Sequence, residues 1–363
     1  MNDFSNANYF PLDYDAVEKE FLMLDVKLED ITDASFLDSR MNINWSRATR
    51  VPETCLVDLL ETPTQAMLFH TAFCGSTLLA KALDDAPNIV SLKEPNSLLS
   101  ISDASLRFPN QELHQSLQTT LKLLGRPWTH SGQTLIKPMN SVNRLLPDTL
   151  KLMRCKAILL YSSLKEFIMS CCKKLPAADN HIRWMAQHLF HGTRLQRELG
   201  IPSNYRFHFL EACVIAWYAQ MEWYAMALAD DRDDKLHTLD MQDLMASPEI
   251  VVASCAKFLQ FDTSPFVISE RVAKVFSRNS KNAAEEYSPQ IREKEREAIR
   301  TRFGAALEAA GYATQISVEV GRVIDSPARR NAAASAPWPN STGPHSAKSA
   351  AEKPMAKLSS RSA

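Results

Sequence analysis

Short apolar runs alternate with longer segments of helical periodicity through the middle of the chain. A short apolar run bounded by turn residues is typical of a buried strand, and apolar positions spaced by three and four residues are typical of a helix. The expected strands are residues 67–69, 89–92, 134–137, 156–161 and 235–240. Strands that alternate with helices predict a three-layer α/β fold, with a parallel sheet of about five strands and helices on both faces.

The helices expected around these strands differ in character. The segment 209–229 is strongly apolar, but Glu211, Gln220 and Glu222 interrupt it, which favours a buried helix over a membrane span. Its aromatic residues, including Trp217 and Trp223, recur at helical spacing and are more typical of a core than of a substrate pocket. The other expected helices cover residues 77–83, 111–124, 143–153, 164–172, 176–208, 250–259, 266–276 and 292–310.

The two ends of the chain differ from its middle. Residues 1–60 are a mixed lead-in, with weak helical periodicity over residues 15–24, and are expected to pack on the core. Residues 61–324 are expected to form the α/β domain. From about Asp325 the chain is rich in Ala, Ser, Pro and Lys and has almost no large apolar residues, so residues 325–363 are expected to be a disordered tail.

Composition narrows the class of protein. A net charge of −1 over 363 residues provides no basic field for nonspecific binding to nucleic acid. Seven cysteines without C-x-x-C spacing indicate reduced thiols and neither a disulfide framework nor a zinc site. The N-terminus lacks the pattern of a secretory signal. We therefore expect a cytoplasmic protein with no nucleic-acid or membrane partner; the oligomeric state is left open.

The segment after the first strand has the pattern of an anion-binding loop. Residues 71–75 are expected to form a tight loop that ends at Gly75, and Ser76 is expected to cap the helix that begins at Thr77. A strand, a glycine loop and a helix in this order direct backbone N–H groups and the positive end of a helix dipole at one point, most often a phosphate site. A nucleotide-hydrolysing P-loop carries a lysine after its last glycine, whereas here Ser76 and Thr77 follow Gly75 directly.

Charged residues end the neighbouring strands. Lys93 and Glu94 precede Pro95 after the second strand, and Lys137 precedes a proline after the third. Because the carboxyl ends of parallel strands face the ligand crevice, we expect these side chains near the loop. His70 ends the first strand. The pair His188 and His191 lacks a carboxylate at ligand spacing, so we expect no metal.

These motifs together resemble the sulfotransferase family, over residues 64–285. Residues 71–78 match the family's loop for the 5'-phosphosulfate of the donor, and Lys93-Glu94-Pro95 resembles the Gly-Glu-Pro of bacterial members. Ser162 follows the fourth strand, where the family has the arginine of its 3'-phosphate signature, and Ser170 lies eight positions later, where it has a serine. The later matches are Asp240, Asp243-Leu244, Pro248, Phe258-Leu259 and the basic loop 278–281.

The resemblance implies an enzyme that transfers a sulfuryl group from 3'-phosphoadenylyl sulfate to a hydroxyl or amine of a small-molecule or glycan acceptor, without a metal. Glu94 is the candidate base, with His70 as the alternative, and Lys93 and Lys137 are candidates for stabilising the developing charge. Trp184, Trp217 or Trp223 are candidates for lining the acceptor pocket. The implied donor-binding residues are Thr71, Phe73, Cys74, Gly75, Ser76 and Thr77 at the 5' end, and Ser162, Ser170, Arg278 and Lys281 at the 3'-phosphate.

Two departures from the family pattern leave alternatives open. Phe73 stands where the family usually has a lysine or arginine, and Ser162 stands where it has an arginine. A charge-assisted contact to phosphate is worth about 1.5–3 kcal/mol, so these replacements bear directly on affinity for the donor. The alternatives are a non-catalytic module of the same fold that binds a nucleotide or a protein, and an atypical kinase.

Overall fold

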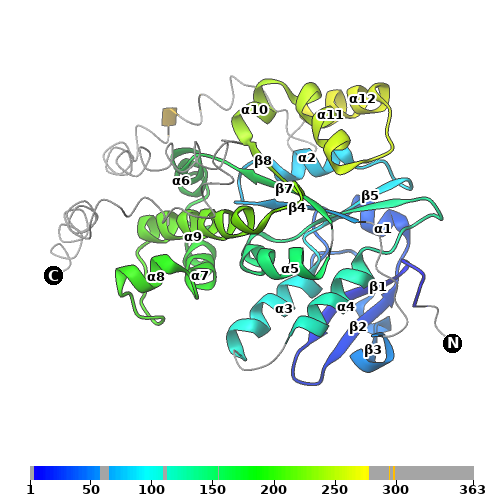
Figure 1. The fold of residues 1–363 in the computed structure, drawn as a ribbon, viewed down its shortest axis with the longest axis horizontal. Coiled ribbons are helices and arrows are strands. Elements are labelled where there is room, and N and C mark those ends of the chain that lie inside the picture. The colour runs from blue at the N-terminus through cyan, green and yellow to red at the C-terminus, as the bar shows by residue number, and fades with distance from the viewer. Residues whose placement is uncertain are drawn as a thin grey trace.

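A computed structural model describes residues 4–57, 65–108, 113–153 and 155–277, together with residues 294, 297 and 298. Its centre is a five-stranded sheet with the order β5-β6-β4-β7-β8, in which every pair of neighbouring strands is parallel (Figure 1). The strands are β4 (Gln65–His70), β5 (Ile89–Lys93), β6 (Gln133–Lys137), β7 (Lys156–Tyr161) and β8 (Leu236–Asp240). All five predicted strands are present.

The order of the strands determines where a ligand crevice can form. The chain leaves central β4 for the edge strand β5, returns through β6 beside β4, and then continues on the other side of β4 with β7 and β8. The strand order therefore reverses at β4. In open parallel sheets the ligand crevice lies at the carboxyl ends of the strands, at such a reversal. The loop after β4 occupies that position.

Helices cover both faces of the sheet, which confirms the predicted three-layer α/β fold (Figure 1). On β4, Ala66 and Leu68 belong to one core cluster, and Met67 and Phe69 belong to the other, as the alternation of strand side chains requires. The first cluster lies under α2 (Ser76–Leu83), α10 (Met241–Ala246), α11 (Pro248–Leu259) and α12 (Pro265–Phe276). The second includes residues of α3 (Asn96–Arg107), α4 (His114–Leu124), α5 (Leu146–Leu152), α6 (Leu164–Lys173), α7 (Asp179–Phe190) and α9 (Phe209–Asp230).

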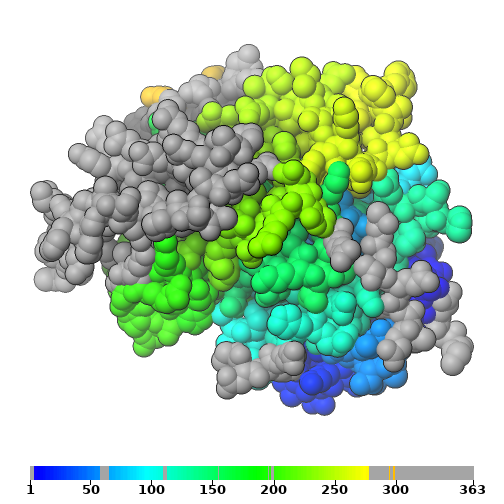
Figure 2. All heavy atoms as spheres, in the orientation of Figure 1, coloured from blue at the N-terminus to red at the C-terminus, as the bar shows by residue number. Residues whose placement is uncertain are grey.

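The N-terminal segment contains a second, antiparallel sheet of order β1-β2-β3. The expectation of helical structure over residues 15–24 is therefore wrong. The strands are β1 (Tyr9–Asp15), β2 (Glu20–Asp25) and β3 (Thr49–Pro52). On β1 the buried side chains Phe10, Leu12 and Tyr14 are two residues apart. Burial that repeats every two residues is the pattern of a strand, whereas a helix repeats every 3.6 residues. This sheet packs on α3 and α4, and it lies at the opposite end of the visible face from α11 and α12 (Figure 2).

The long helical region expected over residues 176–208 is divided. Helix α7 ends at Phe190, Gly192 adopts a φ of 80°, and the hydroxyl of Thr193 caps the next helix, α8 (Arg194–Leu199). A left-handed glycine followed by an N-capping threonine ends one helix and starts another. No helix in the described part of the chain has both the length and the hydropathy to cross a bilayer.

Helix α9 is buried, as its sequence predicts. The indole N–H of Trp217 donates to the Ser162 carbonyl at 2.8 Å, and that of Trp223 donates to the Leu189 carbonyl at 3.0 Å. These rings are therefore core residues with satisfied polar atoms. Trp184, the third candidate for the acceptor pocket, is partly buried on α7, where its ring stacks on His181 and is tilted against His188.

The remaining described elements are one short α-helix, α1 (Leu28–Asp33), and three 3₁₀ helices, η1 (Trp45–Arg47), η2 (Glu53–Cys55) and η3 (Asn140–Leu145). The seven cysteines all carry free thiols, and six of them are buried. The predicted basic loop with Arg278 and Lys281, the predicted helix over 292–310 and the predicted tail over 325–363 lie largely or wholly outside the described residues. The domain boundaries remain a prediction.

Candidate functional site

The loop between β4 and α2 turns through several left-handed residues. Ala72, Phe73 and Gly75 have φ values of 63°, 52° and 81°. A left-handed conformation costs an ordinary residue roughly 1–2 kcal/mol, and such strain is concentrated at functional sites. At Gly75 a Cβ atom would make only ordinary contacts, the nearest being Leu244 Cδ2 at 3.6 Å, so the backbone angle and not the space requires glycine.

The polar groups of the loop that could contact an anion are few. Gly75 is the N-cap of α2, so the expectation that Ser76 caps this helix is wrong. Ser76 and Thr77 form the first turn, where backbone N–H groups lack intrahelical partners. Their side chains and that of Thr71 are buried. Cys74 points inward, with its Sγ 3.7 Å from the Leu160 carbonyl, and burial raises the pKa of its thiol. Cys74 therefore has only its backbone available for a ligand.

Glu94 and Lys137 form an ion pair beside this loop. Lys137 Nζ lies 2.5 Å from Glu94 Oε1, and the lysine has no solvent exposure, while the glutamate side chain is 13% exposed. The Glu94 N–H donates to the Lys137 carbonyl at 2.7 Å, so the backbone also joins the two residues. Glu94 has a φ of 58°, a left-handed angle held by a non-glycine residue directly after a strand.

His70 connects the ion pair to the loop. Its Nδ1 accepts a hydrogen bond from the Ala72 N–H at 3.1 Å, and its Nε2 lies 3.7 Å from Glu94 Oε1. An imidazole that accepts at Nδ1 carries its proton on Nε2, so the N–H of His70 faces the carboxylate. The His70 carbonyl accepts from Asn143 Nδ2 at 3.0 Å, which fixes the end of β4 to η3.

Lys93 has a different environment from Lys137, although the two residues are paired in register on β5 and β6. Lys93 Nζ donates to the Thr32 carbonyl at 2.8 Å and is directed at the N-terminal segment. Burial lowers the pKa of Lys93 to about 8, with the charges of Lys81 and Lys137 acting in the same direction. The structure brings Glu94, Lys137 and the loop together, and it engages Lys93 in holding α1.

The N-terminal segment also reaches the site, which the sequence did not indicate. The Leu37 N–H donates to the Lys93 carbonyl at 2.7 Å, and the Asn96 N–H donates to the Leu37 carbonyl at 2.9 Å. These bonds place the Phe36 ring 6.0 Å from Lys137 Nζ, with the Arg40 guanidinium 3.9 Å from the ring centroid. No local sequence signal identifies Phe36 or Arg40, because their position depends on contacts with β5.

The residues predicted for the 3'-phosphate are only partly described. Ser162 has no solvent exposure, and its carbonyl accepts the Trp217 N–H, so its hydroxyl is enclosed in the protein. Ser170 is partly buried on α6, and Phe73 packs against Phe167 of the same helix with ring centroids 5.9 Å apart. Arg278 and Lys281 lie outside the described residues.

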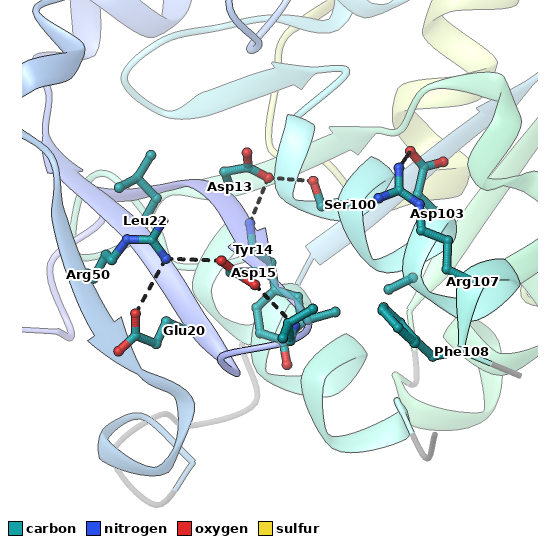
Figure 3. A pocket seen from close by; sticks show the side chains of 13 residues that line it. Asp13, Tyr14, Asp15, Glu20, Leu22, Arg50, Ser100, Asp103, Arg107 and Phe108 are labelled. Carbon is teal, nitrogen blue, oxygen red and sulfur yellow. Dashed lines mark hydrogen bonds and ion pairs between the residues drawn. The ribbon is translucent and has the colours of Figure 1, made fainter. Parts of the chain in front are cut away.

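A separate cavity of about 320 Å³ lies between the N-terminal hairpin and α3 (Figure 3). Arg50 bridges Asp15 and Glu20 there, at 3.1 and 3.4 Å, and Asp13 accepts a hydrogen bond from Ser100. Its lining includes none of the residues predicted for the site. Over the described residues, no group of three or more His, Cys, Asp or Glu side chains could hold a metal ion.

A second polar cluster near this cavity has the composition of a hydrolytic triad. His188 Nε2 lies 2.9 Å from Ser102 Oγ, and His188 Nδ1 lies 3.4 Å from Asp103 Oδ1. Ser102 has no solvent exposure and lies inside α3, and burial lowers the pKa of His188 to about 3. An enclosed hydroxyl cannot meet a substrate, so the cluster joins α3 to α7.

Comparisons with known proteins identify only distant structural similarity. No family model and no curated protein matches the chain. Solved structures with similarity include a sulfotransferase domain from the curacin biosynthetic pathway (13% identity, TM-score 0.39, covering 67% of this chain and 98% of that domain). A sulfotransferase domain from the Synechococcus PCC 7002 olefin synthase has 14% identity and a TM-score of 0.36, covering 65% of this chain and 84% of that one.

A third similar structure is the mouse sulfotransferase SULT7A1 complexed with PAP, at 10% identity and a TM-score of 0.35, covering 72% of this chain and 92% of that one. Identities and scores in this range do not assign the chain to a family. Its function is therefore inferred below from the residues of the site.

The burial of Lys93 predicts a specific dependence of stability on pH. Between pH 8 and 10.5 the folded protein has released the Lys93 proton while the unfolded chain still holds it. The free energy of unfolding must therefore rise with pH in this range. Relative to Lys93→Met, the wild type should gain stability from pH 7 to pH 10, by on the order of 3 kcal/mol at most, at 1.36 kcal/mol per pKa unit.

Urea denaturation of both proteins across this range measures the difference, in which the other titrating groups cancel. Parallel stability curves for the wild type and Lys93→Met would show that Lys93 has an ordinary pKa.

The buried ion pair predicts unequal effects of its two single substitutions. Glu94→Leu leaves a fully enclosed ammonium without its partner and should cost about 3–5 kcal/mol. Lys137→Met should cost less, because the Glu94 carboxylate keeps some contact with solvent. The double variant should be more stable than Glu94→Leu alone.

Chemical denaturation of the four proteins gives the coupling energy. The pair Arg183 and Asp179, 2.7 Å apart on α7 with side chains 36% exposed, serves as the more solvated control and should show less than about 1 kcal/mol. Equal coupling in the two pairs would contradict the assignment of a buried, mutually dependent pair.

Proposed function

We propose that this protein is a sulfotransferase-like enzyme that binds 3'-phosphoadenylyl sulfate at residues 71–77 and transfers the sulfuryl group to a hydroxyl or amine of a small-molecule or glycan acceptor. The observation that carries the proposal is the position of His70. Its imidazole contacts the predicted anion loop through Ala72 and faces the carboxylate of Glu94, which supports the proposal that the predicted loop and the predicted base act together.

The loop suits the 5' end of such a donor and lacks the groups that serve a triphosphate. The N–H groups of the first turn of α2 and the hydroxyls of Ser76 and Thr77 are suited to an anion. A nucleotide-hydrolysing loop has a lysine after its last glycine, followed by the hydroxyl residue that binds magnesium. Here no lysine follows Gly75, so the loop lacks this Lys-Ser/Thr pair. The donor would supply the activated sulfuryl group.

Glu94 suits the role of general base. Lys137 and His70 both approach its Oε1, so in this arrangement we assign Oε2 to receive the acceptor proton. In the transfer, the acceptor oxygen or nitrogen would bond to sulfur, the bond from sulfur to the 5'-phosphate oxygen would break, and the acceptor proton would pass to Glu94.

Lys137 has a role that follows from the same proton transfer. While Glu94 is ionised, the carboxylate compensates the charge of the buried ammonium. Once Glu94 takes the proton, that compensation is lost, and the Lys137 charge becomes available to the negative charge developing on the departing phosphate. His70 has its proton directed at Glu94, so it suits a positioning group better than the base.

The first test of this proposal is the binding of adenosine 3',5'-bisphosphate, the product form of the donor, by calorimetry. Gly75→Val should weaken this binding at least about tenfold, because valine disfavours the left-handed angle that shapes the loop. Gly192→Val is the matched control, since Gly192 has nearly the same φ, 80° against 81°, and lies between α7 and α8.

The control should lose stability by a similar amount and bind normally. If the wild type bound no adenosine 3',5'-bisphosphate, the proposed donor would be wrong, and equal binding by Gly75→Val would show that the ligand does not use this loop.

The second test concerns catalysis by Glu94. Glu94→Gln keeps an oxygen that can accept from Lys137 but cannot take up a proton in the same way. Turnover with an acceptor found by screening should fall by roughly 10²–10⁴-fold, while affinity for the bisphosphate changes little. Full activity in Glu94→Gln would exclude Glu94 as the base, and a wild type that binds without turnover would favour the non-catalytic module.

A further inference from the structure

One amide side chain is enclosed in the apolar middle of α9. Gln220 has no solvent exposure, and its chain neighbours Ala219 and Met221 are buried with it. Burying an amide is unfavourable unless its polar atoms form hydrogen bonds inside the protein. A glutamine amide has two N–H donors and a carbonyl oxygen that accepts two hydrogen bonds. The partners of these four positions therefore indicate what Gln220 contributes.

All four hydrogen-bonding positions of the Gln220 amide are occupied. Its Oε1 accepts from Asn140 Nδ2 at 3.2 Å and from Asn143 Nδ2 at 3.1 Å. Its Nε2 donates to the Ala216 carbonyl at 2.9 Å, one turn earlier in the helix, and to the Thr71 carbonyl at 3.5 Å, the longest of the four. One side chain thus joins α9 to η3 and to the first residue of the loop after β4.

Asn143 extends this connection to the last residue of β4. Its Nδ2 donates to the His70 carbonyl at 3.0 Å as well as to Gln220. The two carbonyls that precede the left-handed residues of the loop are therefore both held, that of His70 through Asn143 and that of Thr71 by Gln220 directly. A left-handed backbone is unfavourable for residues with a Cβ atom and persists only where surrounding contacts fix it.

The same stretch of backbone sets the direction of the His70 ring. Its Nδ1 accepts from the Ala72 N–H at 3.1 Å, and its Nε2 lies 3.7 Å from Glu94 Oε1. A rotation of the backbone between residues 70 and 72 would carry the Ala72 N–H away from the imidazole. The carbonyls of this stretch are the ones that Gln220 and Asn143 hold.

We infer that Gln220 is a positioning residue of the candidate site, which fixes the turn from β4 into the loop so that His70 faces Glu94. The inference rests on the proposed function, since the loop and His70 belong to the site proposed there. Gln220 is enclosed and acts through Thr71 and Asn143. Packing alone would be met by an apolar residue of similar size, so the hydrogen bonds are what the glutamine supplies.

Nitrogen-15 NMR of the imidazole groups, in the full chain without ligand, tests the positioning directly. At about pH 8, where an ordinary imidazole is neutral, the wild type should show His70 protonated at Nε2 only, with His70→Gln identifying its resonances. Gln220→Met and Asn143→Ala should each produce a mixture of the two tautomers. Asn140→Ala is the matched control, because Asn140 donates to the same Gln220 oxygen but has its other contact with Met185 of α7.

Calorimetry with adenosine 3',5'-bisphosphate measures the effect on the loop. Because only molecules with a correctly formed loop bind, Gln220→Met should weaken binding by about 3–10-fold, the value of roughly one hydrogen bond, and Asn140→Ala by less than about twofold. Gln220→Glu should restore the wild-type affinity at acidic pH, because a protonated carboxyl again has a donor and an acceptor, and burial favours that form. This rescue separates hydrogen bonding from packing.

An unchanged His70 tautomer in Gln220→Met, or equal changes in Asn140→Ala and Asn143→Ala, would overturn the inference. Failure of Gln220→Glu to restore binding at acidic pH would do the same. If Gln220→Met does not fold, Gln220→Glu and the two asparagine variants carry the same test. A wild type that bound no bisphosphate would overturn the proposed function, and the His70 resonances would still decide whether Gln220 positions that residue.

Discussion

An ammonium group with no solvent exposure requires an opposite charge at contact distance, and at Lys137 the carboxylate of Glu94 meets that requirement. The effective cost of burying an unpaired ion is several kcal/mol, which exceeds the roughly 1–2 kcal/mol of a left-handed residue. The structure accordingly holds Glu94 at a φ of 58°, where its carboxylate reaches both Lys137 and His70. The geometry of the candidate site thus depends on this one ion pair.

The connection between β2 and β3 is part of the environment of that pair. The Thr32 carbonyl accepts the hydrogen bond of Lys93, and Leu37 bonds to the backbone on both sides of Glu94, at Lys93 of β5 and at Asn96 of α3. Phe36 and Arg40 consequently lie beside Lys137 and Glu94. A segment with no chemical motif of its own therefore contacts the candidate site.

In a nucleotide-hydrolysing P-loop, the loop supplies both the backbone N–H groups that contact the phosphates and the lysine that carries the positive charge. In this protein the loop lacks that lysine. Backbone N–H groups and the hydroxyls of Ser76 and Thr77 remain in the loop, while positive charge approaches from other elements. Lys137 lies on β6 behind Glu94, and Lys174 follows α6 and contacts Phe73. Charges held outside the loop can be compensated or exposed separately, and that separation is the basis for the proposed role of Lys137 in the transfer.

The sequence by itself determined the five central strands, the loop at residues 71–77 and the buried character of α9, because each follows from residues adjacent in the chain. The hairpin of β1 and β2 was missed, since its period-two burial appears only once the sheet has a core to face. Lys93 and Lys137 show the limit most clearly. Both are lysines at strand ends followed within two residues by proline, yet one holds the N-terminal segment and the other holds Glu94.

Only the tertiary structure decided that difference, and the same holds for Phe36, Arg40 and Lys174. Glu94 and Lys137 are 43 residues apart, and the order of the strands brings them together. Local pattern encodes whether a residue is buried and on which element it lies. The partner of a buried charge depends on which strands and loops become neighbours, and that is a property of the whole packed chain.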